Sequence, residues 1–463
     1  MEEYGTLKFN NGAHPGKCEI DDRNNIIVTV YESDLNDGPD VILANFKHSC
    51  YEIYDNKLID FEVGYYKFQA SYLFNGGNFI KKIDRHIKKF EFTFSQLTQW
   101  LNLSIIKEFE NGVKIEIPED IILLDNEDIK VKIGFNKETD KNNSTKISIG
   151  VEAYIVVESK KAMSVDEIMK IIQIITRFFA LIIGYTENVR NIITYESEPF
   201  EYKRFLIINT DFSNNVDAER SYNFYEFRTK WSDFKTSHFK NIFENWWNLN
   251  KNDNFSMVIQ QFYSPYIGRC LEEEFLANVR VIEELYELKN EGNKKEIEEN
   301  LRIDLGEFYQ KHCDELKEII NNNTQLKSKH VRNYLNKAEQ IHQDLINSVI
   351  GAYNMRKTLD VKLKEMDEYQ ELERILNNKD IINVDNKKCE NMNVYNYIAN
   401  TRNYYTHLSS NNSNIISDNV LSKYIRSLEK IIVHNLMKEI QLDENIISNL
   451  LQTDMYLNAW LLL

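Results

Sequence analysis

Proline is confined to the first part of this chain. All five prolines lie within the first 265 of 463 residues, and the 198 residues that follow contain four glycines and no proline. Because proline and glycine are the residues that most disfavour the interior of a helix, the second part is predicted to be helical. The first part holds most of the turn-forming residues, so the sequence predicts two regions of different build.

The first part shows the pattern of β-strands. Segments rich in Val, Ile, Tyr and Phe recur up to residue 160, and in one of them Phe90, Phe92 and Phe94 share a face. Turn signals such as Asn11-Gly12 and Asn111-Gly112 separate the segments. We therefore expect an antiparallel β domain, either a sandwich or an open barrel.

A change of hydrophobic period marks a helix after these strands. Ser164 and Glu167 have the spacing of a capping box, and an apolar helical stretch follows as far as Gly184. This helix is expected to cover one face or end of the sheet. Residues 210–268 then form an aromatic connector whose large side chains recur at helical spacings, which indicates docking against a neighbouring domain. These side chains are Trp231, Phe234, Phe239, Phe243, Trp246 and Trp247.

The remaining residues predict a bundle of helices. One helix is expected over Cys270–Leu288, a second over Asp304–Ile320, and a last long one over Ser417–Ile440. The predicted fold is an α+β multidomain protein, in which an N-terminal antiparallel β domain with a covering helix precedes a C-terminal all-α helical bundle. The predicted domains are 1–209 (β-rich), 210–268 (connector) and 269–463 (bundle).

Composition excludes several classes of protein. The net charge of −16 argues against a broad, non-specific coat of nucleic acid, and no apolar run is long enough to span a membrane. The first residues lack the pattern of a signal peptide, so a cytoplasmic location is expected. The five cysteines are scattered, and P-loop, GxGxxG, HExxH and GxSxG signatures are absent. We therefore expect no metal and no cofactor.

One short segment has the residue types needed for work on a phosphodiester. Arg402, Asn403 and His407 lie near the end of a predicted helix, and the i,i+4 spacing places Asn403 and His407 on one face. An arginine binds an anion through its planar fork, a histidine moves protons near neutral pH, and an asparagine orients the imidazole or holds a phosphate oxygen. The alternative is a helix end where His407 meets the helix dipole and Arg402 forms a surface ion pair.

The context of this segment resembles a known superfamily. The pattern Arg402-Asn403-x3-His407, followed by a loop and a final helix in a proline-free bundle, resembles the HEPN superfamily. The stretch Thr401–Leu408 is similar to the ApeA-type branch, whose members act in bacterial anti-phage abortive infection. Phe275–Leu288 is similar to the first helix of that branch, with Glu283 at its acidic position.

The β region is also similar to the ApeA N-terminal domain, in Gly5-Thr6-Leu7 and in Phe92–Leu101. The resemblance implies a metal-independent endoribonuclease. His407 would be the general base or acid, Arg402 would stabilise charge on the phosphorus oxygens, and Asn403 would position His407 or the phosphate. Because one motif supplies one histidine, a homodimer with a composite site is expected. The N-terminal domain would restrain the bundle until it senses a trigger encoded by the phage.

The RNA partner, with tRNA as one candidate, requires contacts of its own. Lys329 and Arg332 belong to a basic cluster and could contact phosphates, and Tyr404 or Tyr405 could stack on a base. A solvated basic surface and two core aromatics are the ordinary alternatives.

Two other functions fit parts of the sequence. A catalytically silent HEPN module could bind nucleotide, RNA or a protein partner. A carbohydrate-binding β sandwich with a helical oligomerisation tail would use Trp100 and the aromatic connector.

Overall fold

The computed structural model describes most of the 463 residues. The residues it leaves undescribed are 10–11, 22–24, 32–40, 48, 63, 76–86, 95, 104–105, 110–111, 144–145, 185–188, 197–201, 209–226, 235, 264–269, 323–339, 341–357, 384–391, 408–413, 454–456 and 458–463.

The chain divides into two compact units. The first unit comprises Met1–Gly268 and Val433–Leu463, and the second comprises Arg269–Ile432. The predicted division into 1–209, 210–268 and 269–463 stays a prediction.

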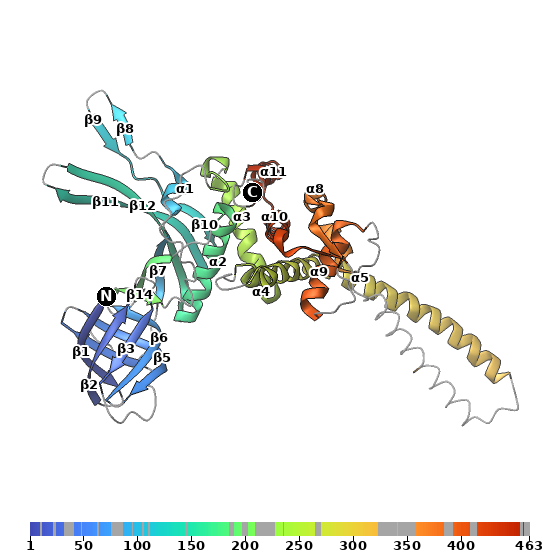
Figure 1. Cartoon of the computed structure of the whole chain (residues 1–463), viewed down its shortest axis with the longest axis horizontal. Helices are drawn as coiled ribbons and strands as arrows, with labels where there is room; N and C mark the ends of the chain where they lie inside the picture. The colour runs from blue at the N-terminus through green and yellow to red at the C-terminus, as the bar shows by residue number, and fades with distance from the viewer. Residues whose placement is uncertain are drawn as a thin grey trace. The chain divides into compact units, whose positions relative to one another are not determined.

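Six strands at the N-terminus form a closed antiparallel barrel (Figure 1). Their order is β6-β3-β2-β1-β4-β5, and β5 pairs again with β6 to close the circle. The fold class predicted for this region is confirmed, although the barrel is closed where an open barrel or a sandwich was expected. The strands are β1 (Glu2–Phe9), β2 (Gly12–Ile20), β3 (Ile26–Val30), β4 (Val41–Phe46), β5 (Cys50–Glu62) and β6 (Tyr65–Asn75).

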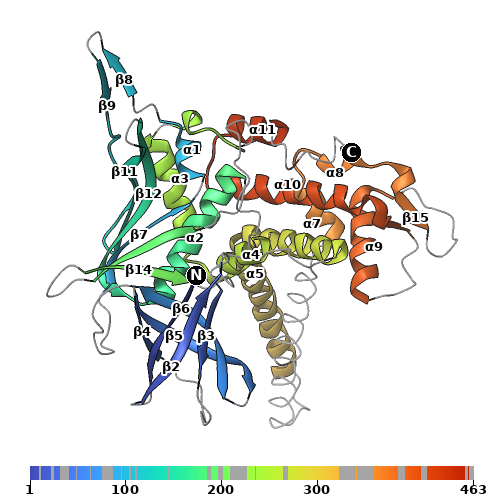
Figure 2. The ribbon, with the colours of Figure 1, turned by 60° about the vertical axis from the view of Figure 1, so that its left-hand side comes forward.

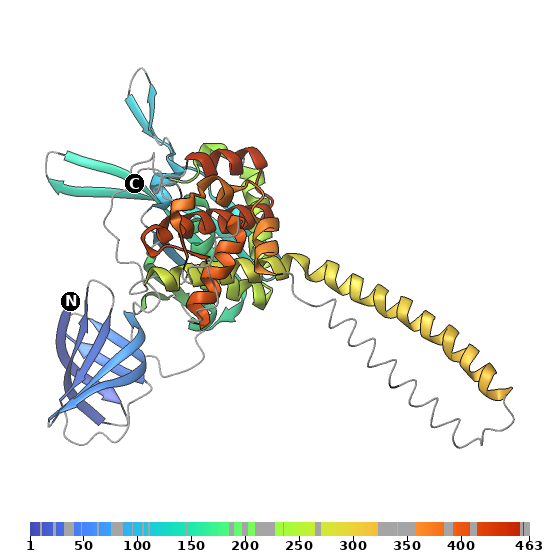
Figure 3. The same ribbon diagram turned by 45° about the vertical axis from the view of Figure 1, so that its right-hand side comes forward.

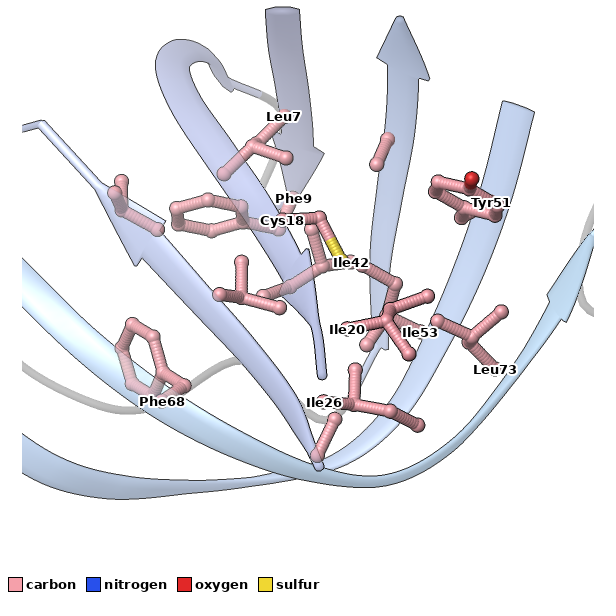
Figure 4. Packing of buried hydrophobic residues seen from close by; sticks show 14 of the residues in the cluster. Leu7, Phe9, Cys18, Ile20, Ile26, Ile42, Tyr51, Ile53, Phe68 and Leu73 are labelled. Carbon is pink, nitrogen blue, oxygen red and sulfur yellow. The ribbon is translucent and has the colours of Figure 1, made fainter. Parts of the chain in front are cut away.

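Alternate side chains of these strands fill the barrel (Figure 4). Leu7, Cys18 and Ile53 are each at most 2% exposed, as expected for the inward-facing positions of a small barrel. Gly5 and Gly16 are paired across β1 and β2. A Cβ atom at Gly16 would overlap the Leu7 side chain and the Thr29 carbonyl, so the sequence needs glycine at this position for the backbones to approach.

The same sheet continues beyond the barrel through the pairing of β14 with β6. The order of this part is β10-β11-β12-β7-β13-β14. A separate hairpin is made by β8 and β9. The strands are β7 (Ile87–Phe94), β8 (Ile106–Phe109), β9 (Gly112–Ile115), β10 (Ile121–Asp125), β11 (Ile129–Asn143), β12 (Lys146–Met163), β13 (Val189–Glu196) and β14 (Tyr202–Ile208).

Helix α2 (Val165–Ile183) covers this second part of the sheet. The capping box is confirmed, since Ser164 Oγ accepts from the Glu167 backbone N–H at 3.2 Å and Glu167 Oε2 accepts from the Ser164 N–H at 2.7 Å. The helix ends at Gly184, whose φ of 102° is readily adopted by glycine. Phe179 packs on Phe94 of β7 with ring centroids 5.1 Å apart.

The aromatic connector docks onto α2 and the short helix α1 (Leu97–Leu101). It contains η3 (Trp231–Asp233), α3 (Thr236–Leu249) and α4 (Asp253–Phe262). Phe243 meets Phe178 of α2 at a centroid distance of 5.0 Å, and Trp246 Nε1 donates to the Ile174 carbonyl at 2.8 Å. Trp100 is fully buried, which removes it from any carbohydrate-binding surface. The docking interpretation of the connector is confirmed.

The second unit is mainly helical. Helix α5 (Leu271–Asn321) is one continuous helix of 51 residues (Figure 3), so the prediction of separate helices over Cys270–Leu288 and Asp304–Ile320 was wrong. The intervening residues are rich in Glu, Lys and Asn, and the helix-favouring Glu and Lys outweigh the cost of Gly292. The other helices of this part are α7 (Leu359–Met366), α8 (Glu371–Ile375), η4 (Asn378–Asp380), α9 (Val394–His407), η5 (Asp418–Val420) and α10 (Leu421–Glu439).

Two features depart from a plain bundle. A short antiparallel pair, β15 (Ile381–Asn383) and β16 (Asn414–Ile416), accompanies α9 (Figure 2). The end of α10, from Val433, and helix α11 (Glu444–Thr453) belong to the first unit. The α+β architecture with a helical C-terminal part is confirmed.

Candidate active site on helix α9

Helix α9 carries the Arg-Asn-x3-His segment in its last two turns. The helix begins at an Asn393 cap, whose Oδ1 accepts from the Asn396 backbone N–H at 2.9 Å. The buried Thr401 hydroxyl donates to the Tyr397 carbonyl at 2.7 Å and accepts from the Ile416 N–H at 2.9 Å. Thr401 therefore ties the helix to β16 directly before the candidate site.

Arg402 is held by one acidic and one amide side chain. Its Nη2 lies 3.4 Å from Glu283 Oε2 on α5, and its Nη1 donates to Asn403 Oδ1 at 3.1 Å. The side chain of Arg402 is 33% exposed and that of Glu283 25%. The structure thus brings together three of the predicted site residues, Glu283, Arg402 and Asn403, at a partly solvent-exposed position.

His407 is the last residue of α9. The helix is continuous from Asn403 to His407, so the predicted i,i+4 relation of these two positions is confirmed at the level of the backbone. The His407 side chain lies outside the described part of the structure, and so do the whole of Lys329 and Arg332.

Tyr404 and Tyr405 follow Arg402 on the same helix. Both are partly exposed, and their ring centroids are 5.6 Å apart. The Tyr405 hydroxyl donates to Asp418 Oδ1 in η5, and its ring meets Phe275 of α5 at 6.2 Å. Burial, followed by the bond to Asp418, raises the pKa of Tyr405, so its hydroxyl remains protonated. Tyr405 therefore anchors the last turn of α9, while Tyr404 is the more available of the two rings.

Sequence reasoning missed Asp418 and Thr401 as supports of this site. Thr401 stands next to the motif, and a threonine inside a polar helix gives no signal of its own. Asp418 is 13 residues from Tyr405 and lies beyond the end of α9 and beyond β16, so no helical spacing relates the two positions.

The surroundings of Arg402 are acidic. Glu283 is its ion-pair partner, and Glu272 acts electrostatically on the neighbouring Tyr405 together with Asp418. Among the described residues, no three His, Cys, Asp or Glu side chains are grouped as a metal site. Nor is any described helix long and apolar enough to cross a membrane.

The fold and the segment on α9 define a class of protein, one in which a β-rich N-terminal region precedes a helical region of the HEPN type. Comparison with protein families agrees with this class. The family described as ApeA N-terminal domain 1 matches residues 2–246, and the family described as Apea-like HEPN matches residues 241–446. The chain therefore belongs to the ApeA-like HEPN defence proteins. No curated protein and no solved structure matches it.

Membership sets the general expectation for activity. HEPN domains are generally nucleases, often dimerise and act on RNA, and the ApeA-like family suggests an anti-phage effector.

Proposed function

We propose that this protein is a metal-independent endoribonuclease that acts as an effector of bacterial anti-phage abortive infection in the cytoplasm. The observation that carries the proposal is the position of Arg402. Its side chain is one-third exposed, it contacts Asn403, and it stands on the helix that ends at His407.

The ion pair of Arg402 suits a group that must release one anion and bind another. Charge-assisted N–H···O bonds are usually about 2.7–2.9 Å long, and the Arg402–Glu283 distance of 3.4 Å exceeds that range. A partly exposed pair of this kind contributes little to stability. A phosphodiester carries more acceptor oxygens around its charge, so it could displace Glu283 and engage the planar fork of Arg402.

The proposed reaction consumes no water. The 2′-hydroxyl of a ribose attacks the adjacent phosphorus atom, one proton carrier removes the proton of this hydroxyl, and another donates a proton to the departing 5′-oxygen. The products are a 2′,3′-cyclic phosphate and a free 5′-hydroxyl. His407 serves as a proton carrier, Arg402 stabilises the negative charge on the phosphorus oxygens, and Asn403 positions His407 or a phosphate oxygen.

Two proton carriers require two copies of the motif. A homodimer that joins two α9 segments would supply both copies of His407 to one composite site. Lys329, Arg332 and Tyr404 are the proposed RNA contacts, tRNA is one candidate substrate, and the N-terminal region would restrain the site until a phage-encoded trigger arrives.

Expression of the full chain in bacteria tests the core of the proposal. The wild type should protect a culture against phage and degrade RNA on infection, whereas Arg402→Ala and His407→Ala should do neither. Arg374→Ala removes an exposed arginine at the end of α8 and serves as the matched control. If the site variants protect as well as the wild type and RNA stays intact in all cultures, the nuclease proposal is wrong. RNA binding that persists without cleavage products would favour the catalytically silent module.

Mixed dimers test the composite site separately. When wild-type and His407→Ala chains are co-expressed in equal amounts, random pairing leaves about one quarter of the dimers with two intact copies. Activity should then fall to about one quarter of that of the wild-type dimer at equal total protein, because one histidine is not enough. A fall to only one half would show that each chain cuts RNA by itself.

A further inference from the structure

Two arginines and one tyrosine hydroxyl of the first unit lie within electrostatic reach of one another; Arg228 and the Tyr263 hydroxyl are buried, and Arg177 is partly exposed. Arg177 is on α2, Arg228 precedes η3, and Tyr263 directly follows α4. The positive charges of both arginines act on the Tyr263 hydroxyl, so the three groups are close in space although up to 86 residues separate them. None of them has a part in the nuclease proposal.

The Tyr263 hydroxyl is buried without compensation from the described residues. Its oxygen makes no hydrogen bond with any of them, while the rest of the residue is partly exposed. Buried hydroxyl groups normally have a hydrogen-bond partner, because desolvation without one is unfavourable. A hydrogen-bond acceptor is therefore missing at this place from the described part of the chain.

Arg177 also has no partner among the described residues, and its side chain carries a full positive charge. Burial lowers its pKa, and the Tyr263 hydroxyl is the one described group that opposes this shift. Within the described ranges, Arg177 has neither a hydrogen bond nor a carboxylate partner. Arg177 is partly exposed, and a guanidinium that has lost part of its hydration is stabilised by an anion beside it.

Arg228 is held rigidly next to these groups. Its Nη1 donates to the Leu181 carbonyl at 2.9 Å and its backbone N–H to the Ile183 carbonyl at 2.8 Å. Thr229 Oγ1 donates to the Ile182 carbonyl at 2.9 Å in the same way. The end of α2 favours a cation, which explains where Arg228 is held. It does not supply an acceptor for Tyr263 or a counter-charge for Arg177.

We propose that Arg177, Arg228 and Tyr263 form a binding site for a phosphate group, either as free phosphate or as part of a nucleotide. Two guanidinium groups and a phenolic hydroxyl offer several donors and two positive charges. A phosphate matches them with three or more acceptor oxygens and up to two negative charges, whereas a carboxylate has two oxygens and one charge. A ligand here would join α2, the segment before η3 and the end of α4.

The test uses the full chain with Arg402→Ala as its parent, so that phosphate binding at α9 makes no contribution. Thermal unfolding and calorimetry are measured with inorganic phosphate and with adenosine monophosphate, against sodium chloride at equal ionic strength. Phosphate should raise the unfolding temperature of the parent, as any ligand of the folded state does. Adenosine monophosphate that binds more tightly than phosphate would identify a nucleotide site, and equal binding would identify a site for phosphate alone.

Two further variants locate the site. Tyr263→Phe, which removes one hydroxyl, should weaken phosphate binding about tenfold, and Arg177→Gln should abolish it. Tyr4→Phe removes the hydroxyl of a tyrosine that is 61% exposed and should leave binding unchanged. Binding that is absent from a folded parent, or that is as strong with Arg177→Gln, overturns the proposal.

Discussion

Arg402 Nη2 lies 3.4 Å from Glu283 Oε2, and 119 residues separate the two positions in the sequence. The pair joins α9 to α5 at the only segment of the chain with the Arg-Asn-x3-His pattern. An acid at this place has two opposing effects on the proposed reaction. It orients the guanidinium of Arg402, and it competes with the phosphodiester for the same N–H groups.

Replacing this acid with its amide should separate the two effects. Glu283→Gln keeps the shape and one acceptor oxygen but removes the negative charge, so the KM for RNA should fall about threefold while kcat stays within twofold, in line with the small energy of a partly exposed pair. Steady-state cleavage of a defined RNA checks this. Glu307→Gln, an exposed position on the same helix, is the control. A rise in KM with Glu283→Gln would show that orientation outweighs competition.

The anchor formed by Tyr405 and Asp418 should affect turnover more than substrate binding. Tyr405→Phe removes the hydroxyl that bonds Asp418 and keeps the ring on Phe275. The turn that bears His407 then loses one fixed point, and we expect kcat to fall about tenfold with little change in KM. Asp418→Asn and the double variant Tyr405→Phe/Asp418→Asn complete a double-mutant cycle. If the two single effects simply add, the hydroxyl and the carboxylate do not act through each other.

The same anchor gives a pH dependence of stability with a definite sign. The pKa of Tyr405 is raised above the ordinary 10.0, first by burial and then by the bond to Asp418. The folded state therefore keeps this proton where the unfolded state loses it, so the stabilisation is complete below pH 10 and decreases as pH rises beyond it. Urea unfolding between pH 8 and 11 should show a smaller decrease for Tyr405→Phe than for the wild type. If the free energy of unfolding decreases equally with pH in both proteins, the raised pKa of Tyr405 is contradicted.

Local features of this chain could be predicted from the sequence and non-local ones could not. The capping box at Ser164 and Glu167 was predicted correctly, because both partners lie within one turn of a helix. Closure of the barrel depends on β5 pairing with both β4 and β6, and strand patterns do not reveal whether an edge finds a partner. The Tyr405–Asp418 bond joins α9 to η5 across 13 positions of the sequence and leaves no periodic signal.

In the candidate site, too, the local relationships could be predicted from the sequence and the non-local ones could not. The spacing of Asn403 and His407 followed from the helical period, whereas the choice of Glu283 rested on the resemblance to a family. Its pairing with Arg402 was not predicted and comes from the structure. Physical pattern alone could not choose Glu283 among the acids of α5, because Glu272, Glu273 and Glu274 lie on the same helix.

The capping box offers a direct test of how α2 is held. Ser164→Ala removes the acceptor of the Glu167 N–H and should lower the free energy of unfolding by about 1 kcal/mol. Ser164→Thr keeps a hydroxyl at the N-cap, so this variant should retain most of the free energy of unfolding that Ser164→Ala loses. Chemical denaturation followed by circular dichroism measures both. An unchanged midpoint for Ser164→Ala would mean that packing of α2 on the sheet makes the cap dispensable.

Closure of the barrel can be tested through its cysteine. Cys18 is 2% exposed inside the barrel, and burial raises the pKa of its thiol from 9.0 to about 12, so at pH 8 the reactive thiolate is scarce and inaccessible. Cys270 is exposed and serves as the control within the same molecule. A maleimide added to the native chain should therefore label Cys270 at least a hundredfold faster than Cys18, as followed by peptide mass spectrometry. In denaturant both should react at similar rates. Rapid labelling of Cys18 in the native protein would show that the barrel opens to solvent.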